Sequence, residues 1–167
     1  RSIAMESEKS DVRLDIVNKL DDDDLLAEIA LNDTDSVVRS EAVKKVTSHD
    51  ALLKIVSTEK DPFVRQIAVK NLNDREELIK IALNDDYQYV RNHALSNPAL
   101  TDEDDFTYIA VNTSHEDVAF EAMNHISSAK NFIEILKTAK LEGVRKSTLD
   151  HIADLETLIR IVLANKD

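Results

Sequence analysis

The stretch DPFVRQIAVKNLND (residues 61–74) contains a Val-Arg pair inside a segment whose apolar residues recur with helical spacing. The same pair returns along the chain, and one slot holds Val-Ala instead. The first residues of these pairs are spaced by 26, 26, 26, 28 and 26 residues: Val12, Val38, Val64, Val90, Val118 and Val144. A fixed period of this length indicates a repeat architecture, so the repeat decides the fold.

Other columns of the repeat agree when each of these valines is counted as repeat position one. Position eighteen is isoleucine in every copy, once two extra residues near Pro98 are allowed: Ile29, Ile55, Ile81, Ile109, Ile135 and Ile161. Position eleven holds residues that cap helix N-termini, namely Asp22, Ser48, Asp74, Asp102, Ser128 and Asp154. A second cap is expected before the valine at Asp35, Asp61 and Asp86, with Pro62 at the first helical position.

Each repeat is therefore predicted to be two short helices, the first over positions twelve to twenty-one and the second from just before the valine to about position nine. Such helices are shorter than the ~12–15 residues at which isolated helices persist in water, so the pairs must stack on one another. We predict an all-α fold, an α-solenoid of about six 26-residue two-helix repeats, in a single domain over residues 1–167.

The composition favours the same fold class and limits the partners. One glycine, two prolines, 43% hydrophobic and 32% charged residues suit an all-helical protein, and the lack of cysteine excludes disulfides and thiolate metal sites. A net charge of −12 argues against nucleic acid as a partner. Because no segment resembles a membrane span or a signal peptide, we expect no membrane association and a cytoplasmic location, with a secreted origin as the open alternative.

The arginine of the repeat lies inside the apolar arc of the second helix. At about 100° per residue it falls among positions five, six and nine, which are apolar. A buried unpaired charge is destabilising, so the guanidinium needs water or a carboxylate, within the turn or in the next repeat. We predict a structural ladder rather than a row of arginines that grips an acidic ligand. Its members are Arg13, Arg39, Arg65, Arg91, Arg145, Asp35 and Asp61.

The segment LLAEIALNDTDSVVRSEAVKKV (residues 25–46), with its Asp, its Val-Arg and its paired short helices, resembles the HEAT-like repeats. The resemblance covers essentially the whole chain. It implies a right-handed, armadillo-like α-solenoid whose second helices line a concave surface, and a non-catalytic scaffold that binds other proteins. The segment VRNHALSNPALTDEDDFTYIA (residues 90–110) also resembles the leucine-rich repeat variant, in which Asn-Pro breaks the second helix.

Positions three, four, seven and eight of the second helices lie outside the apolar arc and are expected to face the groove. Asn side chains there can bond the backbone of an extended peptide, and exposed apolar residues can anchor it. The candidate partner-binding residues are Lys44, Lys45, Ile67, Lys70, Asn71, His93, Asn97, Phe120, Asn124, His125 and His151. We expect a protein or peptide partner along this surface.

An enzyme is the alternative. Deoxyhypusine hydroxylases, which share the HEAT-like repeats, bind two irons through His-Glu pairs at the third and fourth places of the second helix, and no such pair occurs here. His125 and His151 share position eight in consecutive repeats. A metal- or cofactor-dependent enzyme or regulatory subunit that uses this region is therefore the rival hypothesis. Because no third ligand is evident in the pattern, we predict no metal, cofactor or catalytic residue.

The ends of the sequence fall inside repeats. Residues 3–5, IAM, lie 26 before residues 29–31, IAL, and the last first helix is followed by no Val-Arg helix. Solenoids usually need polar capping repeats. We therefore expect either a piece of a longer array or end-to-end self-association.

Overall fold

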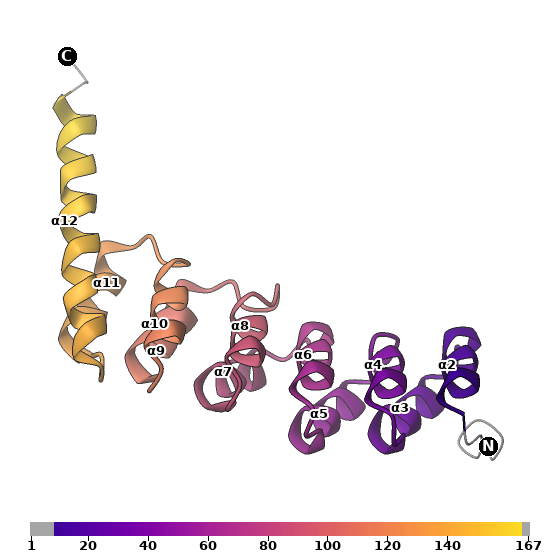
Figure 1. The fold of residues 1–167 in the computed structure, drawn as a ribbon. Coiled ribbons are helices and arrows are strands. Elements are labelled where there is room, and N and C mark those ends of the chain that lie inside the picture. Colours follow the sequence, from indigo (N-terminus) through magenta and orange to yellow (C-terminus); the bar gives the residue numbers. More distant parts are fainter. Residues whose placement is uncertain (1–8, 165–167) are drawn as a thin grey trace. The chain divides into compact units, whose positions relative to one another are not determined.

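The chain forms eleven α-helices and no strand over residues 9–164, which are the residues that this computed structural model describes (Figure 1). Side chains are described as far as Ala153. The all-helical class is thus confirmed for these residues. The helices are α2 (Ser10–Lys19), α3 (Asp23–Asn32), α4 (Ser36–Val43), α5 (His49–Thr58), α6 (Pro62–Asn71), α7 (Arg75–Asn84), α8 (Gln88–Leu95), α9 (Glu103–Asn112), α10 (Glu116–Met123), α11 (Ala129–Thr138) and α12 (Glu142–Ala164).

The chain divides into two compact units, residues 1–74 and 75–167, and each is described by itself. In the first unit α3 packs on α4 and α5 packs on α6, while α2, α4 and α6 pack in series and α3 packs on α5. The unit therefore has two layers of helices (Figure 1). We call α3, α5, α7, α9 and α11 the first helices and α2, α4, α6, α8, α10 and α12 the second helices.

The second unit repeats this plan. The pairs are α7 with α8, α9 with α10 and α11 with α12. The first helices α7, α9 and α11 pack in series, and so do the second helices α8, α10 and α12. Consecutive helices therefore pack in pairs, and the pairs stack within each unit, as expected from helices too short to persist alone.

The core is made by the apolar columns of the repeat. Ile55, Ile109 and Ile135 at position eighteen are fully buried, and so are the small Ala42 and Ala68 at position five, which let the helices approach closely. Burial of each isoleucine side chain contributes about 1.5–3 kcal/mol to stability. Two residues of these columns are exceptions: Val12 at position one is 44% exposed on α2, and Leu149 at position six is 52% exposed on α12.

Capping side chains start five of the described helices. Asp22, Ser48 and Asp102 accept a hydrogen bond from a first-turn amide of α3, α5 and α9, and Asp35 and Asp61 do the same for α4 and α6. Pro62 occupies the first turn of α6, where its missing N–H costs nothing.

The cap predicted at Asp86 is wrong. The N-cap of α8 is Tyr87, which stands three residues before Val90, as Asp35 and Asp61 stand three residues before their valines. The side chain of Asp85 instead accepts the amide of Tyr87 at 2.9 Å. The prediction followed the residue type and missed the spacing.

The helix start predicted at Asp154 is also wrong, because α12 runs without a break from Glu142 to Ala164. The residue before position eleven explains the difference. It is Asp21, Thr47, Asn73, Thr101 or Ser127 where two helices are separated, and Ala153 in α12. Ala is the strongest helix former, whereas the short polar residues compete for backbone groups and favour turns.

Two expectations about the ends lie outside what the structure describes. Residues 3–5 and the side chain of Ile161 are not among the described residues. Among those that are described, none of the helices is both long enough and apolar enough to cross a membrane.

The repeat arginines tie neighbouring helices together through carboxylates of the next helix pair. Arg13 of α2 donates Nε and Nη2 to the two carboxylate oxygens of Asp33, at 2.8 and 2.9 Å. Arg39 of α4 donates in the same way to Glu59, at 2.7 and 3.1 Å. Asp33 and Glu59 each lie twenty residues after the arginine and cap the C-terminus of a first helix. Asp35 and Asp61, predicted as partners, serve as helix caps instead.

The same arginines also bond the backbone six residues earlier. Nη1 of Arg39 donates to the carbonyl of Asp33 at 2.9 Å, and Nη1 of Arg65 donates to the carbonyl of Glu59 at 2.8 Å. Asp33 therefore accepts hydrogen bonds from Arg13 at its carboxylate and from Arg39 at its backbone carbonyl. The chain of bonds runs through the first unit from helix pair to helix pair, and its bidentate geometry needs arginine rather than lysine.

The carboxylate of Asp33 is kept charged by this network. Burial raises the pKa of Asp33, but the hydrogen bonds from Arg13 and from the amide of Asp35 outweigh it and hold the pKa below its usual value. The Arg39 guanidinium has a raised pKa because of its hydrogen bond to Glu59. The Asp33 carboxylate and the Arg39 guanidinium are therefore both charged at neutral pH.

The ladder is incomplete in the second unit. Arg91 donates Nη1 to the carbonyl of Asp85 at 2.8 Å and Nη2 to Asp117 at 3.1 Å, but its buried Nε has no hydrogen-bond partner. The place of the carboxylate is taken by Thr113, whose Oγ1 accepts the amide of His115 at 3.1 Å. In the next copy the arginine and the carboxylate are both absent, because their places hold Ala119 and Ala139. There, arginine and acid are lost together.

Candidate functional site

Position eight of the second helices is structural in the first unit. Lys45 at the end of α4 donates from Nζ to the carbonyls of Val17 and Asn18, each at 3.2 Å, which closes the C-terminus of α2. One repeat later, Nδ2 of Asn71 donates to the carbonyl of Val43 at 3.0 Å, at the C-terminus of α4. These groups satisfy carbonyls that a helix end leaves open. Lys45 and Asn71 therefore hold neighbouring helices rather than present their polar groups to a partner.

Both histidines at position eight stack on phenylalanine. The ring of His125 lies on Phe106 of α9, with centroids 4.4 Å apart and planes inclined by 10°. The ring of His151 lies on Phe132 of α11, with centroids 5.3 Å apart. Phenylalanine replaces leucine at position fifteen in the two copies that precede these histidines. The matched replacement indicates that each histidine packs as the partner of its phenylalanine.

The rival metal hypothesis finds no support in this arrangement. Within the part of the chain that the structure describes, no group of three His, Asp or Glu side chains is placed to hold a metal ion. Nε2 of His125 lies 3.7 Å from Oε1 of Glu121, and Nδ1 of His151 lies 3.1 Å from the carbonyl of Ser147. Each histidine thus has a polar neighbour four residues earlier in the chain.

The remaining candidates in the second unit differ in exposure. Asn97 is only 4% exposed, and its Oδ1 accepts the amide of Ala99 at 2.9 Å, so it shapes the turn after α8. His93 is half-buried on α8. Asn124 is exposed at the end of α10 and donates to Oε2 of Glu121 at 3.3 Å. Only His93 and Asn124 of these three are accessible.

The first unit has an apolar patch on its second helices. Val37 of α4 is 56% exposed and Phe63 of α6 is 65% exposed. Both precede the repeat valine directly, and α4 packs on α6, so the two side chains occupy equivalent places on adjacent helices. Ile67 is half-buried one turn after Phe63 on the same face of α6. We call Val37, Phe63 and Ile67 the α4–α6 patch.

Two exposed lysines border this patch at the C-terminal ends of its helices. Lys44 and Lys70 share position seven, and both are exposed. Lys44 forms an ion pair with Glu41, whose side chain is one third exposed. The surface therefore combines apolar side chains near the helix starts with cations near the helix ends.

Sequence reasoning missed both Val37 and Phe63 as site residues. A signal was present, because the residue before the valine is Val37, Phe63 and Tyr89 in three consecutive copies. At about 100° per residue this position lies opposite the buried arc of the second helix. An apolar column outside the buried arc is the pattern that marks an interaction surface.

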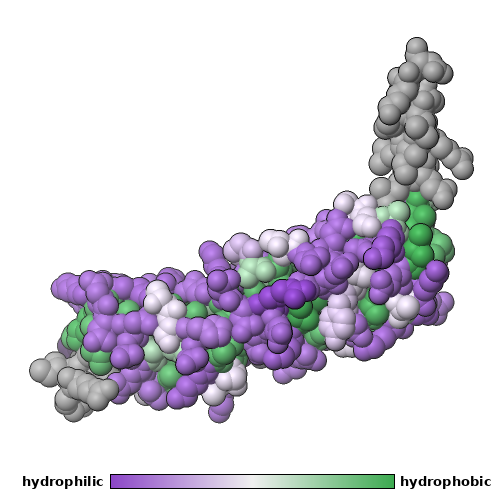
Figure 2. All heavy atoms as spheres, turned by 180° about the vertical axis from the view of Figure 1, so that it is seen from behind, coloured by the Kyte–Doolittle hydropathy of each residue, from purple (hydrophilic) through white to green (hydrophobic). Residues whose placement is uncertain are grey.

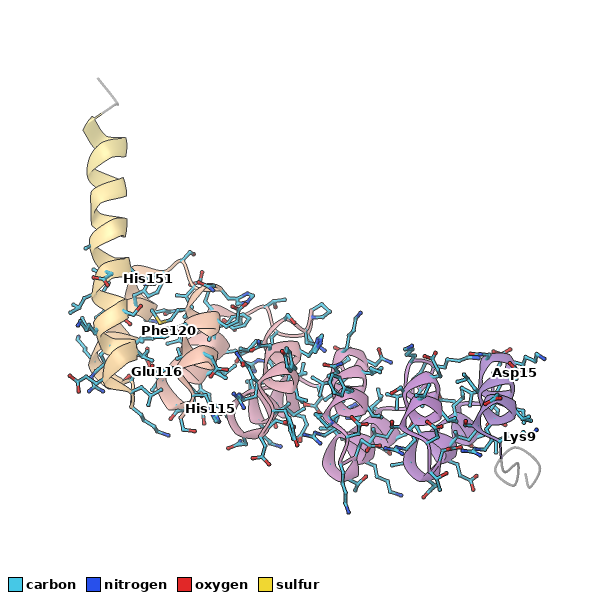
Figure 3. All side chains as sticks on the ribbon, viewed as in Figure 1. Lys9, Asp15, His115, Glu116, Phe120 and His151 are labelled. Atoms are coloured by element: carbon cyan, nitrogen blue, oxygen red, sulfur yellow. The ribbon has the colours of Figure 1, made fainter. Side chains whose placement is uncertain are left out.

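The second unit presents aromatic and acidic side chains on α8 and α10. Tyr89 is 69% exposed on α8, and Phe120 is 39% exposed on α10. Figure 3 shows Phe120 and Glu116 along α10, where their spacing of four residues places them on one face. Figure 2 shows that hydrophilic residues cover most of the face turned away from Figure 1, with small hydrophobic areas between them.

One hollow in the first unit lies beside the arginine ladder. It has a volume of about 230 Å³ and is lined by Ala30, Leu31, Asp33, Arg39, Thr58, Glu59 and Lys60. Its Arg39 and Glu59 pair with each other, and its Asp33 pairs with Arg13. The hollow therefore belongs to the ladder.

Comparison with known proteins adds no further assignment: no family model, no curated protein and no solved structure matches the chain.

Proposed function

We propose that this protein is a non-catalytic scaffold that binds a protein or peptide on the exposed face of its second helices. The proposal includes a right-handed α-solenoid of about six HEAT-like repeats, because the 26-residue period and the stacked helix pairs within each unit fit that architecture. Scaffolds of this kind bind through exposed side chains on a rigid helical support. The site residues must therefore be ones that the fold itself does not need.

The α4–α6 patch is the observation that carries the proposal. Val37 and Phe63 are each more than half exposed on neighbouring helices, although apolar side chains of this size contribute about 1.5–3 kcal/mol when buried. Their exposure does nothing for the fold, while a partner that covers them gains that free energy. Aromatic residues at the centre of a patch are the usual hot spots of protein interfaces.

The charges around the patch indicate the orientation of the partner. Lys44 and Lys70 lie toward the C-terminal ends of α4 and α6, while Asp35 and Asp61 cap the N-termini. The carboxylates of the two aspartates already accept hydrogen bonds from backbone amides of α4 and α6. A segment that places apolar side chains on the patch and acidic side chains beside the lysines fits this surface, by the helix-in-groove or extended-peptide mode.

Affinity capture tests the proposal. The full chain is immobilised and incubated with a lysate of the source cells, and captured proteins are quantified by mass spectrometry for the wild type, for Phe63→Ser and for Tyr108→Ser. Tyr108 is the matched control, because it is an aromatic residue 54% exposed on the first helix α9. We expect Phe63→Ser to lower capture of specific proteins at least about tenfold, which corresponds to ~1.4 kcal/mol, and Tyr108→Ser to leave it unchanged. Equal capture by all three proteins would show that the α4–α6 patch is not the binding site.

A further inference from the structure

We infer that the exposed face of α8 and α10 in the second unit binds a basic, arginine- or lysine-rich segment of a protein partner. This inference rests on the proposed scaffold function, but it concerns another surface and specifies the chemistry of what binds there. The surface is defined by Tyr89, His93, Phe120, Glu116 and Glu121, and we call it the α8–α10 surface.

The first argument is the absence of exposed cations from these two helices. The helices α8 (Gln88–Leu95) and α10 (Glu116–Met123) together contain one lysine or arginine, which is Arg91. It is 5% exposed and donates to Asp85 and Asp117. The equivalent helices α4 and α6 carry exposed lysines at position seven, where α8 and α10 carry Ser96 and Asn124. A basic group that approaches the α8–α10 surface therefore meets no exposed lysine or arginine of these two helices.

The second argument is the accessibility of two carboxylates on α10. The side chain of Glu121 is 46% exposed, and its polar neighbours are the neutral amide of Asn124 at 3.3 Å and the ring of His125 at 3.7 Å. Glu116 is exposed beside the N-terminus of α12. Its Oε1 lies so close to Gly143 that a β-carbon there would be 2.2 Å away, so the single glycine of the chain leaves room for this carboxylate.

The third argument is the aromatic side chains among these acids. Tyr89 is 69% exposed and Phe120 is 39% exposed, and α8 packs on α10. A guanidinium or ammonium over an aromatic face gains about 0.5–1 kcal/mol at an exposed site, in addition to its attraction to a nearby carboxylate. Phe120 and Glu116 are one helical turn apart, so one basic side chain can contact both (Figure 3).

The boundary of the surface supports the same ligand. On α12 the position equivalent to Phe120 is Lys146, which is exposed. A basic segment is repelled there and is held over α8 and α10. An acidic segment is disfavoured on the α8–α10 surface, because the carboxylates of Glu116 and Glu121 repel it.

The experiment selects peptides from a display library of random short sequences on the full-length wild-type protein. The strongest binder that contains Arg or Lys is then synthesised with a fluorescent label, and its affinity is measured by anisotropy. We expect the enriched sequences to combine Arg or Lys with apolar residues. Glu116→Lys/Glu121→Lys should weaken binding at least about tenfold, Phe120→Ser should weaken it several-fold, and added salt should weaken it further.

A matched control separates a defined site from general attraction to an acidic protein. Glu76→Lys/Glu134→Lys changes the net charge by the same amount at exposed positions on the first helices α7 and α11. It should leave the affinity within about twofold, because exposed charges beyond a Debye length of about 10 Å are largely screened. Equal loss in both double variants, or a lack of Arg- or Lys-rich sequences among the enriched peptides, would overturn the inference. Circular dichroism confirms that the variants remain folded.

Failure here is distinct from failure of the proposed function. If Phe63→Ser abolishes capture from lysate while no basic peptide binds the α8–α10 surface, the scaffold function stands and this inference falls. If basic peptides bind and lose affinity with Glu116→Lys/Glu121→Lys while Phe63→Ser has no effect on capture, this surface stands and the α4–α6 patch falls.

Discussion

Replacement of Thr113 by aspartate should stabilise the second unit, because it supplies the carboxylate that the arginine ladder lacks there. The buried Nε of Arg91 has no hydrogen-bond partner, and Thr113 stands where Asp33 stands in the first copy of the repeat. An unsatisfied buried donor costs about 1–3 kcal/mol. An aspartate in the geometry of Asp33 would accept Nε and Nη2 of Arg91, and also the amide of His115 that Thr113 accepts now.

The gain is reduced by the burial of a new charge, since Thr113 is 1% exposed. It is also reduced by repulsion from Asp117, which already accepts from Nη2 of Arg91. We therefore expect a net stabilisation of about 1 kcal/mol for Thr113→Asp, which raises the melting temperature by about 2–4 °C for a chain of this size.

Differential scanning calorimetry of the full chain measures the effect, with Thr113→Asn as the control of similar shape. The neutral amide cannot form the charged bidentate pair, so its melting temperature should stay at or below that of the wild type. A melting temperature lowered by Thr113→Asp, or raised equally by Thr113→Asn, would refute the reasoning that the ladder needs a carboxylate at this place.

Three further predictions follow from the contacts in the first unit. Glu59→Gln breaks the ion pair with Arg39, whose side chain is 16% exposed. This change should lower the free energy of unfolding, measured by urea titration, by about 2–3 kcal/mol. A loss under about 0.5 kcal/mol would contradict this prediction. The folded-state pKa of Asp33 is lowered, so its stabilisation is present above the unfolded pKa and is lost as the pH falls through the folded value; Asp33→Asn should flatten the acid limb of a stability–pH curve, and an unchanged limb would count against it. Lys45→Ala should cost about 1 kcal/mol through loss of its bonds to the end of α2, whereas Lys44→Ala should be nearly neutral, and equal effects in thermal melts would be evidence against a structural role for position eight.

The fold class could be predicted from the sequence because the repeat presents the same helix signals many times. Asp22, Ser48 and Asp102 are each weak evidence for a cap, but their common spacing makes the helix starts plain, and the structure has caps at all three. The errors arose where one copy departs from the others. Ala153 replaces a turn-forming residue and lets α12 continue, and Tyr87 rather than Asp86 occupies the cap position of α8.

The site was harder to predict because exposure on a helix wheel does not tell whether a polar group is already used. Lys45 and Asn71 lie outside the apolar arc, yet each reaches the carbonyl end of the preceding second helix. The ladder partners were missed for a related reason, since Glu59 is twenty residues from Arg39 and only packing of helix pairs brings them together. Sequence spacing describes one helix, whereas these contacts depend on the next pair.

Site-specific photo-crosslinking tests the central claim most directly, namely that a partner binds the exposed face of the second helices. A benzophenone amino acid is placed at position 63 in one protein and at position 108 in another, where Phe63 and Tyr108 are exposed by 65% and 54%. After irradiation in lysate, the account predicts covalent adducts of a specific protein at position 63 and none of that protein at position 108. Adducts at position 108 with none at position 63 would contradict it.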